Sequence, residues 1–338
     1  MLVVAGPTTG HDGGGHPERP ARLDAVMAGL SELEPVRIPA EPANRDDLLR
    51  VHTPDYLDRL DRLCRDGGGH LDADTYVRPD SWDVAVRAAG AGLAAVSALR
   101  DGAGTAAFVA VRPPGHHAEP GRGMGFCLLN NVAVAAAALA ADGERVLIVD
   151  WDVHHGNGAQ EIFWDDPSVL TVSVHQEGYF PPGSGDVSER GGDGAFGTNL
   201  NVPLPPGTGH DAYLALADEV LVPRVRAHRP DLLIICSGYD SSAMDPMGRM
   251  LLHSDSYRRL TERFLALADE VCGGRLVVVQ EGGYSPAYTP FCGLAVLEAL
   301  SGAPAAEDPF LDVFREMPGQ GLTDEQRRYI AAAAADAR

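Results

Sequence analysis

The chain has 338 residues, of which 45% are hydrophobic and 22% are charged, and these proportions are typical of a globular protein with a full-sized core. Its formal net charge of −21 at pH 7 argues against a nucleic-acid backbone as a partner, because phosphates select basic surfaces. The same charge is compatible with a cationic substrate, which an acidic surface concentrates.

Short apolar runs alternate along the chain with helical patterns. The apolar runs, each followed by a polar loop, cover 106–111, 146–149, 169–174, 232–236 and 276–279. The helical patterns cover roughly 82–100, 128–141, 158–164, 210–228 and 254–272. This alternation predicts an α/β protein with a parallel sheet and helices on both faces. We expect one domain over residues 1–338, with a long ordered loop at 176–209 and a terminal helix at 323–338.

The most informative stretch runs from residue 146 to residue 158 and changes character halfway. Its first part is a short apolar run typical of a buried parallel strand. Ligands of open α/β sheets bind where such strands end. Asp152 and His154 follow the run two positions apart, so in an extended segment their side chains point the same way. A carboxylate and an imidazole that face one cavity predict a divalent-metal site.

Three other strand ends of the predicted sheet also carry chemically capable side chains. They supply the pair His116 and His117, then Asp240, then Tyr284. Two adjacent histidines cannot both bind one ion with good geometry, so we interpret them as acid–base groups. A phenol beside a metal can donate a hydrogen bond to a developing oxyanion.

Asp152, His154 and Asp240 could close three positions on a divalent ion and leave the others to water or substrate. Two carboxylates and one imidazole suit zinc, and the same donors also bind ferrous iron or manganese. Such a site, with acid–base histidines and a phenol beside it, predicts metal-assisted hydrolysis of an acyl bond.

Five motifs, in order along most of the chain, resemble those of the histone deacetylase and acetylpolyamine amidohydrolase superfamily. They are Arg-Pro-Pro-Gly-His-His-Ala-Glu (112–119), Met-Gly-Phe-Cys-Leu-Leu-Asn-Asn (124–131), His-His-Gly-Asn-Gly (154–158), Tyr-Asp-Ser-Ser-Ala-Met-Asp-Pro-Met (239–247) and Glu-Gly-Gly-Tyr (281–284). Within that family the chain looks most like class II deacetylases and their bacterial relatives. The resemblance implies an arginase-type fold with a central, mostly parallel sheet of about eight strands and the active site at the strands' carboxyl ends.

The resemblance also implies roles for the residues already singled out. Zinc would bind Asp152, His154 and Asp240. His117 would be the general base and then the acid that protonates the leaving amine, while Tyr284 would bind the scissile carbonyl and its oxyanion. His116, backed by Asp150, would stay largely cationic. Class I members carry Asp where this chain has Asn157 behind His117; class II members commonly carry Asn, which supports an imidazolium less.

Two monovalent-cation sites are implied in the same way. A structural potassium ion would bind Asp150, the Ser173 hydroxyl and the carbonyls of Asp152, His154 and Val174. A second, more remote site would use carbonyls near Phe163, Asp166, Val169 and Thr198.

For the substrate tunnel, the resemblance implies walls from Phe126 and Phe180, and an acceptor in the Gly125 carbonyl. Asp72 would orient the backbone of a peptide substrate. Met247 stands where a polyamine-selective relative carries Glu, so an apolar gate favours acyl-lysine over acetylspermidine. The acidic surface leaves acetylated polyamines open as an alternative.

Other functions compete with a deacylase acting on acyl-lysine or an acylated small amine. One is an arginase-type hydrolase with two manganese ions, which would need a second ligand set; another is a non-catalytic homologue that binds without turnover.

The five cysteines form no Cys-x-x-Cys pair and the N-terminus lacks a basic and apolar leader. We therefore expect a cytoplasmic protein without membrane or nucleic-acid partners, and homo-oligomers stay open.

Overall fold

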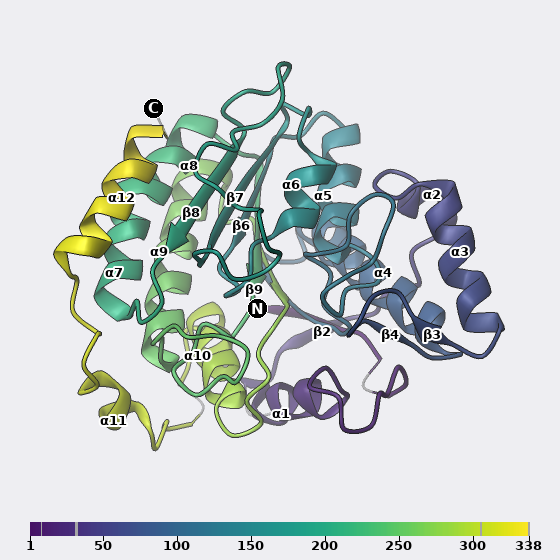
Figure 1. The fold of residues 1–338 in the computed structure, drawn as a ribbon, viewed down its shortest axis with the longest axis horizontal. Helices are drawn as coiled ribbons and strands as arrows, with labels where there is room; N and C mark the ends of the chain where they lie inside the picture. The colour runs from purple at the N-terminus through teal and green to yellow at the C-terminus, as the bar shows by residue number, and fades with distance from the viewer. Residues whose placement is uncertain (8, 31–32, 305, 337–338) are drawn as a thin grey trace.

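The computed structural model describes residues 1–338 apart from 8, 31, 32, 305, 337 and 338. Its centre is an eight-stranded sheet with helices on both faces (Figure 1). The strands of the sheet are β1 (Leu2–Ala5), β2 (Val36–Ile38), β5 (Ala106–Ala110), β6 (Val146–Asp150), β7 (Val169–Gln176), β8 (Asn199–Leu204), β9 (Leu232–Ser237) and β10 (Leu276–Gln280). Their order is β2-β1-β5-β10-β9-β6-β7-β8, and all neighbours pair in parallel. The predicted α/β fold with a parallel sheet of about eight strands is confirmed.

The helices pack on the sheet in two layers. They are α1 (Ala21–Leu30), α2 (Arg45–Leu48), α3 (Pro54–Arg65), α4 (Ser81–Arg100), α5 (Asn131–Ala141), α6 (Asn157–Ile162), α7 (His210–Leu216), α8 (Val222–His228), α9 (Ser254–Cys272), α10 (Thr289–Ser301), α11 (Leu311–Arg315) and α12 (Asp324–Asp336). A short antiparallel pair, β3 (Gly69–His70) and β4 (Tyr76–Val77), stands apart from the sheet. In Figure 1, α4 to α6 lie on one side of the sheet, and α7, α9 and α12 on the other.

Alternate residues of a strand supply the cores of the two layers. In β6, Leu147 and Val149 belong to the core shared with α7, α9 and α10, while Val146 and Ile148 belong to the core under α4 and α5. A parallel strand buried on both faces is apolar at successive positions. This is why the central strands are continuous apolar runs in the sequence.

The structure corrects the expectation for residues 176–209, which contain the edge strand β8 as well as a loop. The strand sequence Asn-Leu-Asn-Val-Pro-Leu includes Asn and Pro, which are depleted in strands. Pro203 is tolerated because β8 pairs on one side only, with β7, and an edge position does not require every backbone N–H.

The predicted helix at 210–228 is three continuous segments, because a π-helical turn at Ala217–Leu221 joins α7 to α8. Pro223 lies directly after this turn and has no N–H for a regular helical bond. The helix expected from residue 128 begins at Asn131, where the Asn130 side chain accepts a hydrogen bond from the N–H of Ala133 at 2.9 Å.

Within the described part of the chain, α4 is the one helix long and apolar enough to cross a membrane. The inside of the protein buries 67% of its most apolar stretch. A core helix passes the same test of length and composition, and α4 packs against α5, β1 and β5.

Gly90 lets α4 approach the segment that precedes α2, since a Cβ there would overlap the Glu41 carbonyl oxygen and crowd the Ala43 nitrogen. We expect Gly90→Ala to lower the free energy of unfolding by about 3 kcal/mol through overpacking. Chemical denaturation measures the change. Gly321→Ala, where the added Cβ meets nothing within 4 Å, is the control, and equal stabilities of the two variants would contradict the prediction.

Candidate active site

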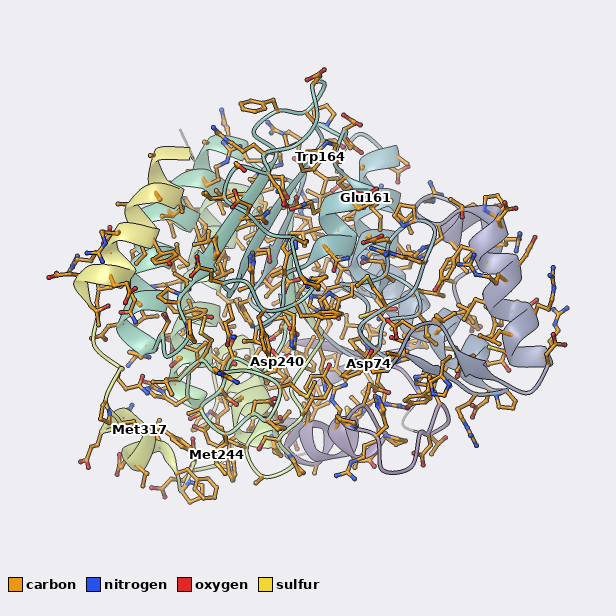
Figure 2. All side chains as sticks on the ribbon, in the orientation of Figure 1. Asp74, Glu161, Trp164, Asp240, Met244 and Met317 are labelled. Carbon is orange, nitrogen blue, oxygen red and sulfur yellow. The ribbon has the colours of Figure 1, made fainter. Side chains whose placement is uncertain are left out.

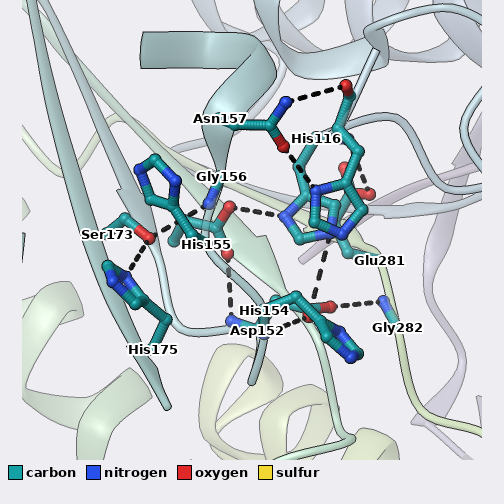
Figure 3. A network of polar contacts seen from close by, with 12 residues as sticks. His116, Asp152, His154, His155, Gly156, Asn157, Ser173, His175, Glu281 and Gly282 are labelled. Carbon is teal, nitrogen blue, oxygen red and sulfur yellow. Dashed lines mark hydrogen bonds and ion pairs between the residues drawn. The ribbon is translucent and has the colours of Figure 1, made fainter. Parts of the chain in front are cut away.

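Four neighbouring strands, β5, β10, β9 and β6, end at one edge of the sheet, and the loops that follow them carry the predicted catalytic residues. His116 and His117 follow β5, Tyr284 follows β10, Asp240 follows β9, and His154 follows β6. Because these strands are adjacent in space, residues from four distant parts of the chain meet at one place. Figure 3 shows the polar network that results around His116, Asp152 and His154.

Asp152, His154 and Asp240 are buried together, and one ligand atom from each lies within 4.8 Å of the others. His154 Nδ1 is 2.9 Å from Asp152 Oδ1 and 3.2 Å from Asp240 Oδ2. Apart from the His154 imidazole, the fully buried Asp240 Oδ2 has no polar partner of its own among the described residues. Asp240 is labelled near the middle of the view in Figure 2, and it is buried. Burial and the charge of Asp152 raise the pKa of Asp240 to about 7, and a bound cation would relieve this repulsion. The three side chains therefore fit a divalent metal ion.

Backbone N–H groups donate hydrogen bonds to the carboxylates of Asp152 and Asp240. The N–H of Val153 donates to Asp240 Oδ1 and the N–H of Gly282 donates to Asp152 Oδ2, each at 2.9 Å. The Gly282 backbone approaches so closely that a Cβ there would overlap an oxygen of each carboxylate. The first glycine of the Glu-Gly-Gly-Tyr motif therefore serves the metal-ligand group directly.

His116 faces two carboxylates. Its Nδ1 lies 2.8 Å from Asp150 Oδ2 and its Nε2 lies 3.8 Å from Asp152 Oδ1. Burial disfavours the charged imidazolium, but the two carboxylates outweigh burial and raise the pKa of His116 to about 10. The two carboxylates therefore favour the imidazolium form of His116.

His117 lies beside His116, with the ring centroids 3.9 Å apart, yet it has the opposite character. Its Nδ1 is 2.7 Å from the carbonyl oxygen of the Asn157 side chain. Burial, together with the charges of His116 and His154, holds the pKa of His117 well below its usual range. Two adjacent imidazoles whose environments separate their charge states can divide electrostatic and acid–base work.

A cavity of about 250 Å³ reaches His117 and His154. Its lining is Asp74, His117, Gly125, Phe126, His154, Tyr179, Phe180, Met247 and Tyr284. The structure thus brings the four expected tunnel residues to one cavity. Tyr179, which the sequence analysis did not single out, stacks on the His154 ring with centroids 5.5 Å apart.

Asp72 lies behind the lining of this cavity. Its Oδ1 accepts hydrogen bonds from the N–H groups of Asp74 and Thr75 at 3.1 and 2.6 Å, and its Oδ2 is 3.4 Å from the Gly125 nitrogen. The carboxylate thereby fixes the loop that bears Asp74, which is exposed and lines the cavity. Binding of a substrate backbone by Asp72 stays a prediction.

The Tyr284 loop is fixed from two directions. Asp245 Oδ2 accepts from the N–H groups of Tyr284 and Ser285 at 2.6 and 3.0 Å. The Arg22 guanidinium lies 4.3 Å from the centre of the Tyr284 ring. Burial raises the pKa of Tyr284 well above its usual range, so the phenol keeps its proton and can donate it in a hydrogen bond.

Glu281 is a buried residue of the site that the sequence analysis quoted in a motif without giving it a role. Its Oε2 accepts from the N–H groups of Gly115 and His116 at 2.7 and 3.2 Å. Burial raises the pKa of Glu281 to about 7. Its contacts tie the histidine loop to the tyrosine loop, and a carboxylate at the end of a buried strand was the signal that could have identified it.

The residues expected at the two monovalent-cation sites lie at opposite ends of β7. Asp150 of β6 and Ser173 of β7 are direct neighbours in the sheet, and the Ser173 hydroxyl also accepts from the N–H of Gly156 at 3.2 Å. The other set, Phe163, Asp166, Val169 and Thr198, lies around the start of β7 and β8, at the edge of the sheet remote from the histidines.

The fold is of the α/β class, and its site combines two adjacent histidines with a buried group of side chains that could hold a metal ion. The histone deacetylase domain matches residues 16–300, and the chain belongs to this family.

Three similar proteins illustrate the relationship. The chain is 46% identical over 325 residues to a histone deacetylase-like amidohydrolase of Pseudomonas aeruginosa, covering 94% of this chain and 85% of that protein. It is 40% identical over 295 residues to a probable deacetylase of Archaeoglobus fulgidus, and the match covers 85% of this chain and 82% of that protein. The crystal structure of the HDA15 HD domain matches with a TM-score of 0.83 at 34% identity, over 99% of this chain and 98% of that one.

We expect Gly282→Ala to weaken divalent-metal binding, because the added Cβ would displace the carboxylates of Asp152 and Asp240. The affinity for zinc, measured by competition with a chromogenic chelator, should fall at least about tenfold. Gly321→Ala again serves as the control. Wild-type zinc affinity in a folded Gly282→Ala variant would show that the two carboxylates do not hold the ion.

Proposed function

We propose that this chain is a zinc-dependent deacylase that hydrolyses the amide of acetyl-lysine in a peptide, or of a related acylated amine. One observation carries the proposal: two adjacent histidines with different partners lie beside three side chains that could hold a metal ion, and one of the two lines a cavity. Membership of the histone deacetylase family supports an acylated amine as the substrate.

Asp152, His154 and Asp240 would hold the zinc ion, which when bound polarises a carbonyl group and makes water more acidic. The buried carboxylates of Asp152 and Asp240, whose oxygens both lie close to the His154 imidazole, would supply the negative charge that such a cation requires. Two carboxylates and one imidazole also accept ferrous iron, so the metal is a testable part of the proposal.

His117 is the group we assign to proton transfer. Its ring lines the cavity, and its low pKa keeps the imidazole neutral and ready to accept a proton from the attacking water. The resulting imidazolium then returns the proton to the leaving amine. Nδ1 bonds Asn157, which leaves Nε2 for both transfers.

His116 and Tyr284 stabilise the charge that develops on the substrate carbonyl. His116 contributes a fixed positive charge, which Asp150 and Asp152 maintain through the raised pKa. Tyr284 contributes a protonated phenol in the wall of the same cavity. Such preorganised groups act most strongly where water is excluded, and both side chains are buried.

The cavity suits an extended apolar stem. Phe126 and Phe180 would flank the methylene groups of an acyl-lysine side chain, and the Gly125 carbonyl would accept from the substrate N–H. The Gly125 backbone has φ +55°, and a Cβ there would crowd both the His117 and Phe180 rings. Glycine at this position therefore keeps the wall thin next to the general base.

A structural potassium ion would lie behind the zinc site, on Asp150, Ser173 and the carbonyls of Asp152, His154 and Val174. The adjacent positions of Asp150 and Ser173 in the sheet support it. The second monovalent site, near Phe163, Asp166, Val169 and Thr198, is proposed on the family resemblance alone.

Acetylated polyamines are the second candidate substrates. Asp74 lines the cavity with an exposed carboxylate and could attract a distal ammonium group. Met247 also lines the cavity and places an apolar side chain at the gate, which favours a peptide. An arginase-type reaction would need two bound metal ions and therefore a second set of metal ligands.

We expect Tyr284→Phe to lower kcat on an acetyl-lysine peptide by about 100-fold, because one donor to the oxyanion is lost. Zinc content should stay at one ion per chain, since Tyr284 is outside the ligand set. Tyr329→Phe removes a tyrosine hydroxyl that bonds Glu177 at the surface and is the matched control. Turnover of Tyr284→Phe at the wild-type rate would contradict the mechanism, as would two bound manganese ions per chain.

A turnover panel of acetyl-lysine peptide, longer acyl-lysines, acetylputrescine and acetylspermidine tests the substrate. We expect kcat/KM for the peptide to exceed that for acetylspermidine at least about tenfold, the effect of one unfavourable charge contact. Met247→Glu should narrow this ratio by attracting the polyamine. Comparable activity on all substrates would show that Met247 does not select between them.

A further inference from the structure

The amide group of Asn157 is bonded on both sides. Its carbonyl oxygen faces His117 Nδ1 at 2.7 Å, and its nitrogen donates to Glu119 Oε1 at 2.8 Å. Weaker contacts of the same nitrogen reach the His117 carbonyl at 3.4 Å and the Met124 sulfur at 3.6 Å. Each of these partners of the Asn157 nitrogen is an acceptor.

This arrangement decides where the hydrogen of His117 lies. A carboxylate can only accept a hydrogen bond, so Glu119 fixes the NH₂ side of the Asn157 amide toward itself. The carbonyl side must then face His117 and can only accept from it. Nδ1 of His117 therefore carries the hydrogen, and the lone pair of the neutral imidazole is on Nε2.

Glu119 is itself held by two parallel hydrogen bonds. Arg122 Nε donates to Oε2 at 2.7 Å and Arg122 Nη2 donates to Oε1 at 2.9 Å. A tight turn brings the two residues together, with the N–H of Glu119 donating to the Arg122 carbonyl at 2.9 Å. Helix α3 anchors the turn, because Arg59 donates to the Gly121 carbonyl at 2.9 Å. A bidentate pair of this kind fixes direction as well as charge.

We propose that Glu119, held by Arg122, is a positioning residue for the general base, which fixes the orientation of the Asn157 amide and through it the tautomer of His117. The inference rests on the proposed role of His117 and extends it outward by two residues. An aspartate at position 157 would place a negative charge directly against the His117 imidazole. In this chain the negative charge is on Glu119, which contacts Asn157 and not the imidazole, and Arg122 neutralises it. The base is oriented without a carboxylate directly against it.

A simple surface ion pair would behave differently. The Arg122 side chain is 60% exposed and that of Glu119 is 19% exposed, and exposed ion pairs contribute little to stability. On that account, loss of the Glu119 charge would leave catalysis and the state of His117 unchanged.

The test is Glu119→Gln in the zinc-loaded enzyme. Glutamine can turn either its oxygen or its NH₂ group toward Asn157, so both orientations of the Asn157 amide become accessible. We expect kcat on acetyl-lysine peptide to fall about tenfold, with KM unchanged because the cavity lining is intact. Nitrogen NMR of the histidine-labelled enzyme, with the His117 signals assigned by their loss in His117→Gln, should change from a single Nδ1–H tautomer to a mixture.

The double variant Glu119→Gln, Asn157→Asp provides a rescue. An aspartate at position 157 accepts both from His117 Nδ1 and from the introduced glutamine amide, so the single tautomer and most of kcat should return. Arg122→Met, which removes only the group that holds Glu119, should give a smaller loss of kcat in the same direction. Coupling of this kind between contacting residues is what a double-mutant cycle measures.

Glu161→Gln is the matched control. It removes the same charge from a residue whose charge also acts on Arg122 but which is not among the described partners of the Asn157 amide, so kcat and the tautomer should both stay as in the wild type. A single Nδ1–H tautomer of His117 in Glu119→Gln would overturn the inference, whatever the kcat of the variant. The NMR result decides the inference even if no acylated substrate is hydrolysed, so its failure can be told apart from failure of the proposed function.

Discussion

The structure depends on the burial of several carboxylates at one edge of a parallel sheet. Asp150, Asp152 and Asp240 are all at most 2% exposed, and like charges brought out of water destabilise a fold unless cations and N–H groups surround them. His116 supplies a positive charge on one side, and backbone N–H groups reach in from neighbouring loops. The chemistry proposed for the site is therefore a consequence of the same charge balance that permits the fold.

A second buried ion group holds the loops in register around this edge. Glu18, which is fully buried, accepts from Arg112 at 2.9 and 2.7 Å and from Arg22 at 3.3 Å. Arg22 in turn donates to the carbonyls of Glu281 and Gly283 on the tyrosine loop. Removing one partner of such a buried group costs about 3–5 kcal/mol. The N-terminal segment thus acts on the site through buried charges, without lining the cavity that leads to the histidines.

Motif residues were more predictable than the contacts between motifs. Asp152 and His154 were expected to lie together because they are two positions apart, and they do. The reason is different, because β6 ends at Asp150 and a bend over 152–154 brings the two side chains together, with the N–H of His154 donating to Asp152 Oδ1. Asp74 was expected in an entrance loop, and it lines the cavity. Tyr179 lines the same cavity from another loop, and its local sequence has no signal for that. The edge strand β8 was missed for a related reason: its Asn and Pro residues disfavour a strand locally, and pairing with β7 overrides that preference.

The sequence by itself determined the fold class and the chemical type of the site, because both depend on short-range patterns: apolar runs that alternate with helical periods, and reactive side chains placed directly after them. Only the tertiary structure decided the charge and orientation of those side chains. His116 and His117 are chemically identical neighbours, and they differ because Asp150 faces one and Asn157 the other. Likewise, Glu119 becomes relevant to His117 only through Asn157. Protonation and tautomer are set by partners distant in the chain, and proximity of that kind exists only after folding.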